Sequence, residues 1–172
     1  MNKSMSVLSL LLPVLVITSL VTPSAFAAST EVTWGDYKKF RDINEGNENR
    51  KSFRERLFKH IDKHLAELAQ DLPEKKVLKI EITDIDLAGD THLGGINRTR
   101  IVKQSYFPRI NLSYDLIDEN GKSIKAETVV IKDMNFMSGS NLKYRNKAFG
   151  YEKKMLDEWF EETFKDMLVE SK

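Results

Sequence analysis

The feature that most constrains the fold is a stripe of apolar residues between positions 53 and 72. Apolar side chains recur there at steps of four or three, the period of an α-helix with one buried face. Pro73 follows the stripe and cannot continue a helix, so the pattern predicts a helix of about 20 residues. Two starts are possible, a Ser52–Glu55 capping box or an asparagine cap at Asn47 or Asn49. The stripe consists of Phe53, Leu57, Ile61, Leu65, Leu68 and Leu72.

The next segment, residues 77–86, alternates between apolar and polar side chains and predicts a strand with one buried face. Asp84 and Asp86 continue the buried parity, where carboxylates replace the apolar residues. Two interpretations follow: a β-bulge reverses the faces at this point, or two carboxylates point toward the core. The apolar positions of the strand are Leu78, Ile80 and Ile82.

Asn120-Gly121 is typical of a two-residue type I′ turn and predicts a β-hairpin around it. Apolar pairs across this hairpin define its core face, and the same parity places Asp133 on that face just past the second strand. Counted outward from the turn, the predicted pairs are Glu119 with Lys122, Leu112 with Val129, and Ile110 with Ile131.

Three further segments complete the expected fold. Val32–Trp34 is a short extended segment, residues 98–106 form a charged edge strand, and residues 151–168 form a second amphipathic helix. The order β-α-β-β-β-β-α predicts a single α+β domain with a mostly antiparallel sheet of four to five strands and both helices on one face. The outer face of the last helix is mainly acidic, with Asp157, Glu158, Glu161, Glu162 and Asp166.

The first 27 residues have the pattern of a signal peptide. Lys3 precedes an apolar run over residues 7–21, and Ala25 and Ala27 have the spacing that signal peptidase recognises. The absence of cysteine excludes a lipid anchor, and no twin arginine is present, so we expect the general secretory route. Cleavage after Ala27 leaves one exported domain, residues 28–172, which we expect to be soluble in the periplasm without a membrane anchor.

Composition narrows the functional classes. With 27 basic and 26 acidic residues, the net charge of +1 argues against a nucleic-acid-binding protein. A chain without cysteine has no thiolate metal site and no thiol nucleophile. The sequence also contains no phosphate-binding glycine motif and no G-x-S-x-G element, so we expect no cofactor and, on balance, no catalytic activity. The oligomeric state is left open.

A cluster of oxygen and nitrogen ligands follows the strand at residues 77–86. Asp84, Asp86, Asp90 and His92 fall within nine residues, and Asp133 joins them if the two strands run in the same direction. Several carboxylates at one point can hold a hard cation or another ligand. Alternatively, aspartates at strand ends cap turns by accepting backbone hydrogen bonds.

His60 and His64 are four residues apart on the first predicted helix, which is a zinc-binding spacing. Ile61 occupies the position of the general-base glutamate of H-E-x-x-H proteases, so a protease is excluded. A non-catalytic zinc or copper site that includes Glu67 is one interpretation. The other is a pair of solvated histidines on the helix flank.

A basic stretch precedes the hairpin and is interleaved with aromatic residues. It can bind an anionic polymer of the cell envelope. It can equally be a charged edge strand that prevents pairing with other sheets. The stretch comprises Arg98, Arg100, Lys103, Tyr106, Phe107 and Arg109.

Several strings together resemble an exported bacterial family known as domain of unknown function 3016. The resemblance extends over the whole of residues 28–172 and implies a protein of the Gram-negative envelope, but it implies no activity or cofactor. We therefore expect a non-catalytic module that binds an envelope protein or an anionic polymer. The alternative is a metal-dependent hydrolase using Asp84, Asp86 and His92. The strings are 32–34 (VTW), 40–43 (FRDI), 72–73 (LP), 83–89 (TDIDLAG), 107–110 (FPRI), 132–136 (KDMNF) and 151–156 (YEKKML).

Overall fold

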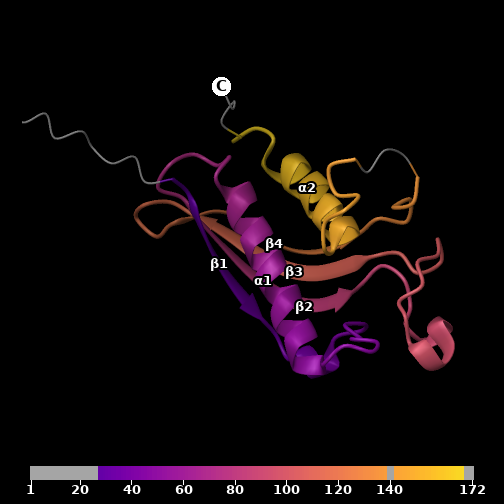
Figure 1. Cartoon of the computed structure of the whole chain (residues 1–172). Coiled ribbons are helices and arrows are strands. Elements are labelled where there is room, and N and C mark those ends of the chain that lie inside the picture. The colour runs from indigo at the N-terminus through magenta and orange to yellow at the C-terminus, as the bar shows by residue number, and fades with distance from the viewer. Residues whose placement is uncertain (1–26, 139–141, 169–172) are drawn as a thin grey trace, which may run out of the picture.

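The computed structural model describes residues 27–138 and 142–168, which contain four strands and two α-helices (Figure 1). The expected signal peptide falls almost entirely on residues 1–26, outside the described residues. No helix within the described ranges is long and apolar enough to span a bilayer. The elements are β1 (Ser29–Trp34), the 3-10 helix η1 (Tyr37–Lys39), α1 (Arg50–Ala69), β2 (Val77–Asp86), the 3-10 helix η2 (His92–Asn97), β3 (Arg109–Ile117), β4 (Ser123–Lys132) and α2 (Gly150–Phe164).

The strands form one sheet in the order β1-β2-β3-β4. β3 is antiparallel to both β2 and β4, so the expectation of a mostly antiparallel sheet is confirmed. β1 is parallel to β2, because α1 carries the chain back along the sheet between them. The sheet is therefore mixed, and β1 and β2 end at the same edge.

The prediction of an edge strand over residues 98–106 is wrong. The main chain of this segment forms an isolated bridge at Ile101, which exchanges two hydrogen bonds of 2.9 Å with Asp90, and the carbonyl of Tyr106 accepts one from Gly89. Arg98 has a left-handed backbone (φ 41°), which a strand does not accommodate. The guanidinium of Arg100 is used in loop contacts, donating to the carbonyls of Gly89 and Asn44. The observed order is β-α-β-β-β-α, with four strands among the described residues.

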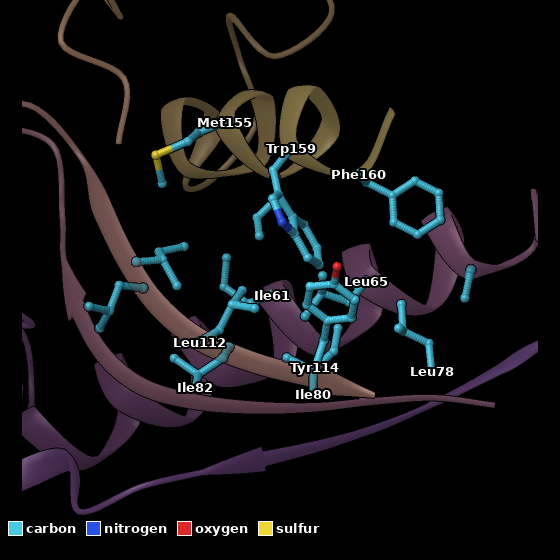
Figure 2. Close-up of a cluster of buried hydrophobic side chains, with 14 of the residues drawn as sticks. Ile61, Leu65, Leu78, Ile80, Ile82, Leu112, Tyr114, Met155, Trp159 and Phe160 are labelled. Carbon is cyan, nitrogen blue, oxygen red and sulfur yellow. The ribbon is translucent and has the colours of Figure 1, made fainter. Parts of the chain in front are cut away.

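Both helices lie on the same face of the sheet, as predicted (Figure 1). Figure 2 shows Ile61 of α1 and Trp159 of α2 above Ile80 of β2 and Tyr114 of β3. The rings of Trp159 and Tyr114 meet edge to face, with their centroids 5.5 Å apart. The opposite face of the sheet carries polar side chains such as Lys79 and Glu81, which are exposed. One helix-covered core therefore holds the domain together.

A β-bulge in β2 settles which way its acidic residues point. The register with β3 shifts between Ile82 and Asp84, so the two faces of the strand are exchanged beyond this point. Ile85 is fully buried in the core, whereas Asp84 and Asp86 are only partly buried. Of the two interpretations of this strand, the bulge is the correct one.

The strands of the hairpin have the predicted register, but the turn differs, and Lys122 is paired with Asp118 rather than with Glu119. Leu112 pairs with Val129 and Ile110 with Ile131, as expected. The turn, however, is a three-residue loop. Asp118 accepts a hydrogen bond from Gly121 (3.0 Å), and Gly121 is left-handed at φ 77° while Asn120 is not. This is a type I turn followed by a bulge rather than a type I′ turn.

Asn49 caps the first helix, which decides between the predicted starts. Its side chain accepts hydrogen bonds from the backbone N–H groups of Lys51 (3.0 Å) and Ser52 (3.1 Å). These are two of the donors that a helix leaves unpaired at its N-terminus. The cap fixes the first turn of α1 beside the ends of β1 and β2.

Candidate functional site

A cleft of about 580 Å³ lies at the edge of the sheet where the parallel strands β1 and β2 end. Its walls come from η1, the loop over residues 40–45, the first turns of α1, and the segment after β2. Asp86, Asp90 and His92, three of the predicted site residues, line this cleft. Asp84 and Asp133 do not.

Asp84 has a backbone-capping role. Its Oδ1 accepts a hydrogen bond of 2.7 Å from the backbone N–H of Arg41, in the loop that follows η1. This contact ties the loop to the end of β2. It corresponds to the capping interpretation of this residue.

Asp86 lies in the cleft wall beside two arginines. Its Oδ2 accepts a hydrogen bond of 3.0 Å from the guanidinium of Arg109, and the guanidinium of Arg41 lies 3.9 Å away. Burial and the nearby Asp42 carboxylate raise the pKa of Asp86, although Arg41 opposes them. The carboxylate is therefore engaged with protein cations.

Asp90 and His92 form a local pair. Asp90 Oδ1 accepts a hydrogen bond of 2.7 Å from the backbone N–H of His92 and lies 2.9 Å from its Nδ1. The backbone hydrogen bond from His92 is the main reason that the pKa of Asp90 is lowered. Among the described residues, no group of three or more histidine or acidic side chains is arranged to hold a metal ion.

Asp133 reaches the same edge of the sheet but the opposite face. β2 and β4 run in the same direction on either side of β3, so their ends do meet there. The side chain of Asp133, however, lies on the helix side, where its Oδ2 accepts from Lys154 of α2 at 3.0 Å. Asp133 is on the predicted core face and does not join Asp84 and Asp86.

The two histidines of α1 have different surroundings. His64 is buried, with Nε2 2.7 Å from Asp157 Oδ1 and 3.1 Å from the carbonyl oxygen of Lys153. His60 is partly buried, and its Nδ1 lies 3.4 Å from Lys153 Nζ. Burial and the Lys153 charge lower the pKa of His60. The expectation of solvated histidines is wrong for His64, and Glu67 is 3.9 Å from its Nδ1.

Asp157 was expected on the exposed acidic face of α2 but is buried, because charged and polar donors surround it. Lys143 donates to its Oδ2 at 2.5 Å, and the hydroxyl of Tyr144 donates to the same oxygen. Burial alone raises the pKa of Asp157, but hydrogen bonds from His64, Lys143 and Tyr144 outweigh it and hold the pKa at about 2. This network joins α1, α2 and the segment before α2.

The charges that line the cleft are unevenly paired. Each of its acidic groups has a close partner, whereas Lys38 and Arg54 form no ion pair among the described residues. Arg54 lies over the ring of Tyr37, 4.0 Å from its centroid. The acidic pairs are Asp42 with Arg100 (2.8 Å), Glu45 with Arg50 (3.3 Å), Asp86 with Arg109 (3.0 Å) and Asp90 with His92 (2.9 Å).

These pairs change the interpretation of the predicted basic stretch. Arg100 and Arg109 are about one-fifth and one-quarter exposed and are occupied by Asp42 and Asp86. The cleft cations without an ion pair among the described residues are instead Lys38 and Arg54, and Arg41 has only a 3.9 Å contact with Asp86. None of the three was among the predicted site residues. The one signal for them was the 40–43 string, which contains Arg41.

The fold and the cleft define a mixed α+β domain with a charged cleft at the carboxyl ends of a parallel strand pair. Residues 28–162 match the family described as "Protein of unknown function (DUF3016)", and the chain belongs to that family. The family resemblance seen in the sequence is thereby confirmed. Searches of curated proteins and of solved structures found no match.

Proposed function

We propose that this protein is a non-catalytic binding module of the periplasm that holds an anionic group in the cleft beside β1 and β2. The ligand class is an acidic polymer of the cell envelope, carrying phosphates or carboxylates. Two lining cations without an ion pair carry this proposal. Among the described residues, Lys38 and Arg54 form no ion pair, and Arg41 lies 3.9 Å from an Asp86 oxygen that Arg109 already engages at 3.0 Å. Every acidic group of the lining has a close partner.

The aromatic residues of the cleft favour the same ligand class. Tyr37 holds the guanidinium of Arg54 by a cation–π contact, which leaves the edge of that group to donate hydrogen bonds. Tyr106 lines the cleft and is 36% exposed, so its ring offers a surface for a sugar. A planar cation beside an aromatic surface suits an acidic saccharide or a phosphate-bearing one.

The alternative, a metal-dependent hydrolase, is less well supported. A catalytic metal needs several free ligands and an open coordination position. Asp86 is engaged by Arg109, Asp90 is engaged by His92, and Asp84 accepts from the backbone of Arg41. These contacts favour binding without catalysis.

The export proposal is supported at the start of the described chain. Ala28 is 6% exposed and belongs to the core, whereas Ala27 is exposed. The family match also begins at residue 28. Cleavage after Ala27 therefore leaves the domain intact. N-terminal sequencing of the protein from a periplasmic extract should give Ala28 first, and recovery in the cytoplasmic fraction with Met1 would refute this part of the proposal.

The binding proposal can be tested by isothermal titration calorimetry on residues 28–172. The probes are a short polyphosphate and polygalacturonate, with neutral dextran as the control polymer. We expect one or both polyanions to bind, with affinity falling as salt rises, and dextran not to bind. Arg41→Gln and Arg54→Gln, made as two single variants, should each weaken binding at least tenfold, because a hydrogen bond to a charged group contributes about 1.5–3 kcal/mol.

Arg145→Gln is the matched control, since Arg145 is exposed and does not line the cleft. It removes the same charge at another place. If Arg145→Gln weakens binding as much as the cleft variants, the attraction is a general charge effect and the cleft is not the site. If neither polyanion binds, the ligand class is wrong.

A further inference from the structure

A second cavity, of about 470 Å³, lies beyond the Asp42–Arg100 ion pair from the cleft. Asp42 lines the cleft and Arg100 lines this cavity, so the ion pair forms part of the wall between them. Apolar side chains supply much of the lining. Phe53 and Leu87 are buried, Phe149 and Tyr151 are partly buried, and Val102 is 36% exposed.

Thr91 lines this cavity, and its buried side-chain hydroxyl lacks a hydrogen-bond partner among the described residues. The residue is 2% exposed. Buried side-chain hydroxyls in proteins nearly always have a partner, and one without a partner calls for an explanation. A ligand with a polar group would supply the missing hydrogen bond.

Glu152 is a second buried polar group of the wall, which also includes exposed charged residues such as Arg98 and Lys147. It is 3% exposed at the start of α2, and its Oε1 accepts a hydrogen bond of 2.8 Å from the backbone N–H of Ala88. A carboxyl group in this position disfavours an anionic ligand close to it. Next to Thr91 and Glu152, an uncharged polar group is therefore favoured over an anion.

Two glycines of the cavity wall allow neighbouring backbone segments to pack closely. A Cβ atom on Gly46 would lie 2.5 Å from the carbonyl oxygen of Arg98. A Cβ atom on Gly150 would lie 2.5 Å from the carbonyl oxygen of Tyr144. Backbone packed on backbone at both places fixes the spacing of the loops that enclose the space.

We propose that this cavity binds a small uncharged amphiphile, an apolar molecule with one hydroxyl or carbonyl group. The apolar part contacts Phe53 and Phe149, and the polar group forms a hydrogen bond with Thr91 Oγ1. This site is separate from the anion site of the cleft, so the two proposals can fail independently.

The test uses three probes that share a phenyl ring with a two-carbon chain, and it follows amide chemical shifts of residues 28–172. 2-Phenylethanol has a hydroxyl, ethylbenzene lacks it, and phenylacetate replaces it by a charge. We expect 2-phenylethanol to shift the amides of residues 87–91 and 149–152. It should bind about tenfold more tightly than ethylbenzene, which is the value of one hydrogen bond, and phenylacetate should bind most weakly.

Two variants complete the test. Thr91→Val has nearly the same shape without the hydroxyl, so it should remain folded and lose the preference for 2-phenylethanol over ethylbenzene. Val102→Trp places a much larger side chain in the cavity lining and should abolish binding of both probes while polyanion binding continues in the cleft, which Val102 does not line. Absence of probe binding to the unmodified domain, or an unchanged preference in Thr91→Val, would overturn the proposal. A loss of folding in Thr91→Val would show that the hydroxyl already has a structural partner.

Discussion

The guanidinium of Arg100 holds the carboxylate of Asp42 by two hydrogen bonds, 2.8 Å to Oδ2 and 3.3 Å to Oδ1, across 58 residues of sequence. It also donates to the carbonyl oxygens of Gly89 (2.8 Å) and Asn44 (2.9 Å). One side chain thus connects the loop after η1, the segment after β2 and the irregular segment before β3. Both cavities depend on this connection.

Arg100→Lys should destabilise the domain by about 2–3 kcal/mol, because an ammonium group cannot form this forked set of hydrogen bonds and leaves carbonyl groups unpaired. Urea unfolding of the variant and of the unmodified domain measures the difference in free energy. Arg145→Lys, at an exposed position, is the control and should change stability by less than about 0.5 kcal/mol. Equal effects of the two variants would show that the Arg100 contacts are not structural.

Asp157→Asn should cost about 2 kcal/mol at neutral pH. The folded pKa of about 2 lies below the usual value of 3.8, so the charged carboxylate stabilises the fold above about pH 4. This stability is lost as the pH falls from about 4 to about 2. Urea unfolding at pH 7, 4 and 2.5 should therefore show a gap between the unmodified domain and Asp157→Asn that narrows with acid. Glu161→Gln, exposed on the same helix, should show no such gap.

Glu152→Gln should make the domain more stable at neutral pH. Burial raises the pKa of Glu152 above its usual value of 4.5, although the N–H of Ala88 opposes this. The folded state then binds more protons than the unfolded state above pH 4.5, so stability falls as the pH rises through that window. A glutamine keeps the acceptor for Ala88 without the charge. Thermal melting from pH 4 to 8 should show a smaller decline in Glu152→Gln than in the unmodified domain.

Glu152→Ala separates the hydrogen bond from the charge. It removes the acceptor of the Ala88 N–H and should destabilise the domain by about 1–3 kcal/mol. If the alanine and glutamine variants are equally stable, the hydrogen bond to Ala88 contributes nothing.

Asp84→Ala should cost about 1 kcal/mol, because the backbone N–H of Arg41 loses its acceptor. The domain should still fold, and chemical denaturation gives the size of the loss. Asp71→Ala, at an exposed position after α1, is expected to stay within about 0.5 kcal/mol of the unmodified domain. No loss in Asp84→Ala would argue against a capping role.

Divalent metal ions should leave the melting temperature unchanged. Protein donors already form hydrogen bonds with the carboxylates of Asp84, Asp86 and Asp90. A metal ion would have to displace these donors in order to bind. Melting with chelator and then with calcium, magnesium, manganese, zinc or copper checks this. A ligand at about 100 times its dissociation constant adds about 2.7 kcal/mol to the folded state, a shift of several degrees. Such a shift, lost in Asp86→Asn, would restore the metal-site hypothesis.

The elements with strong periodicity were predictable from sequence. The stripe from Phe53 onward gave α1, and the alternation over 77–86 gave β2 with its bounds. The hairpin register was also predicted, although for an incorrect reason. The turn is one residue longer than a type I′ turn, and a register shift between Leu116 and Ile117 compensates for it. The residue preferences of short turns could not show the extra loop residue or the register shift.

Long-range pairing of charges was the part that sequence could not supply. Arg100 and Arg109 looked like a free basic surface, and only the fold brings Asp42 and Asp86 to them. Asp157 looked exposed because its helical neighbours are acidic, yet Tyr144 and Lys143 enclose it. Within the candidate site, three of the residues singled out from sequence, Asp86, Asp90 and His92, line the cleft, whereas its cations Lys38 and Arg54 were not selected.

The parallel pairing of β1 sets an order on the growing chain. Ser29 pairs with Val77, which is synthesised 48 residues later, whereas β3 and β4 are joined by a short loop. A chain that emerges from its N-terminus must therefore hold β1 without a partner until α1 and β2 have followed. Until then the backbone N–H and C=O groups of β1 have no partner strand, which is the state in which a strand is most open to incorrect pairing. In this protein the strand that waits longest for its partner is therefore the first one to be synthesised.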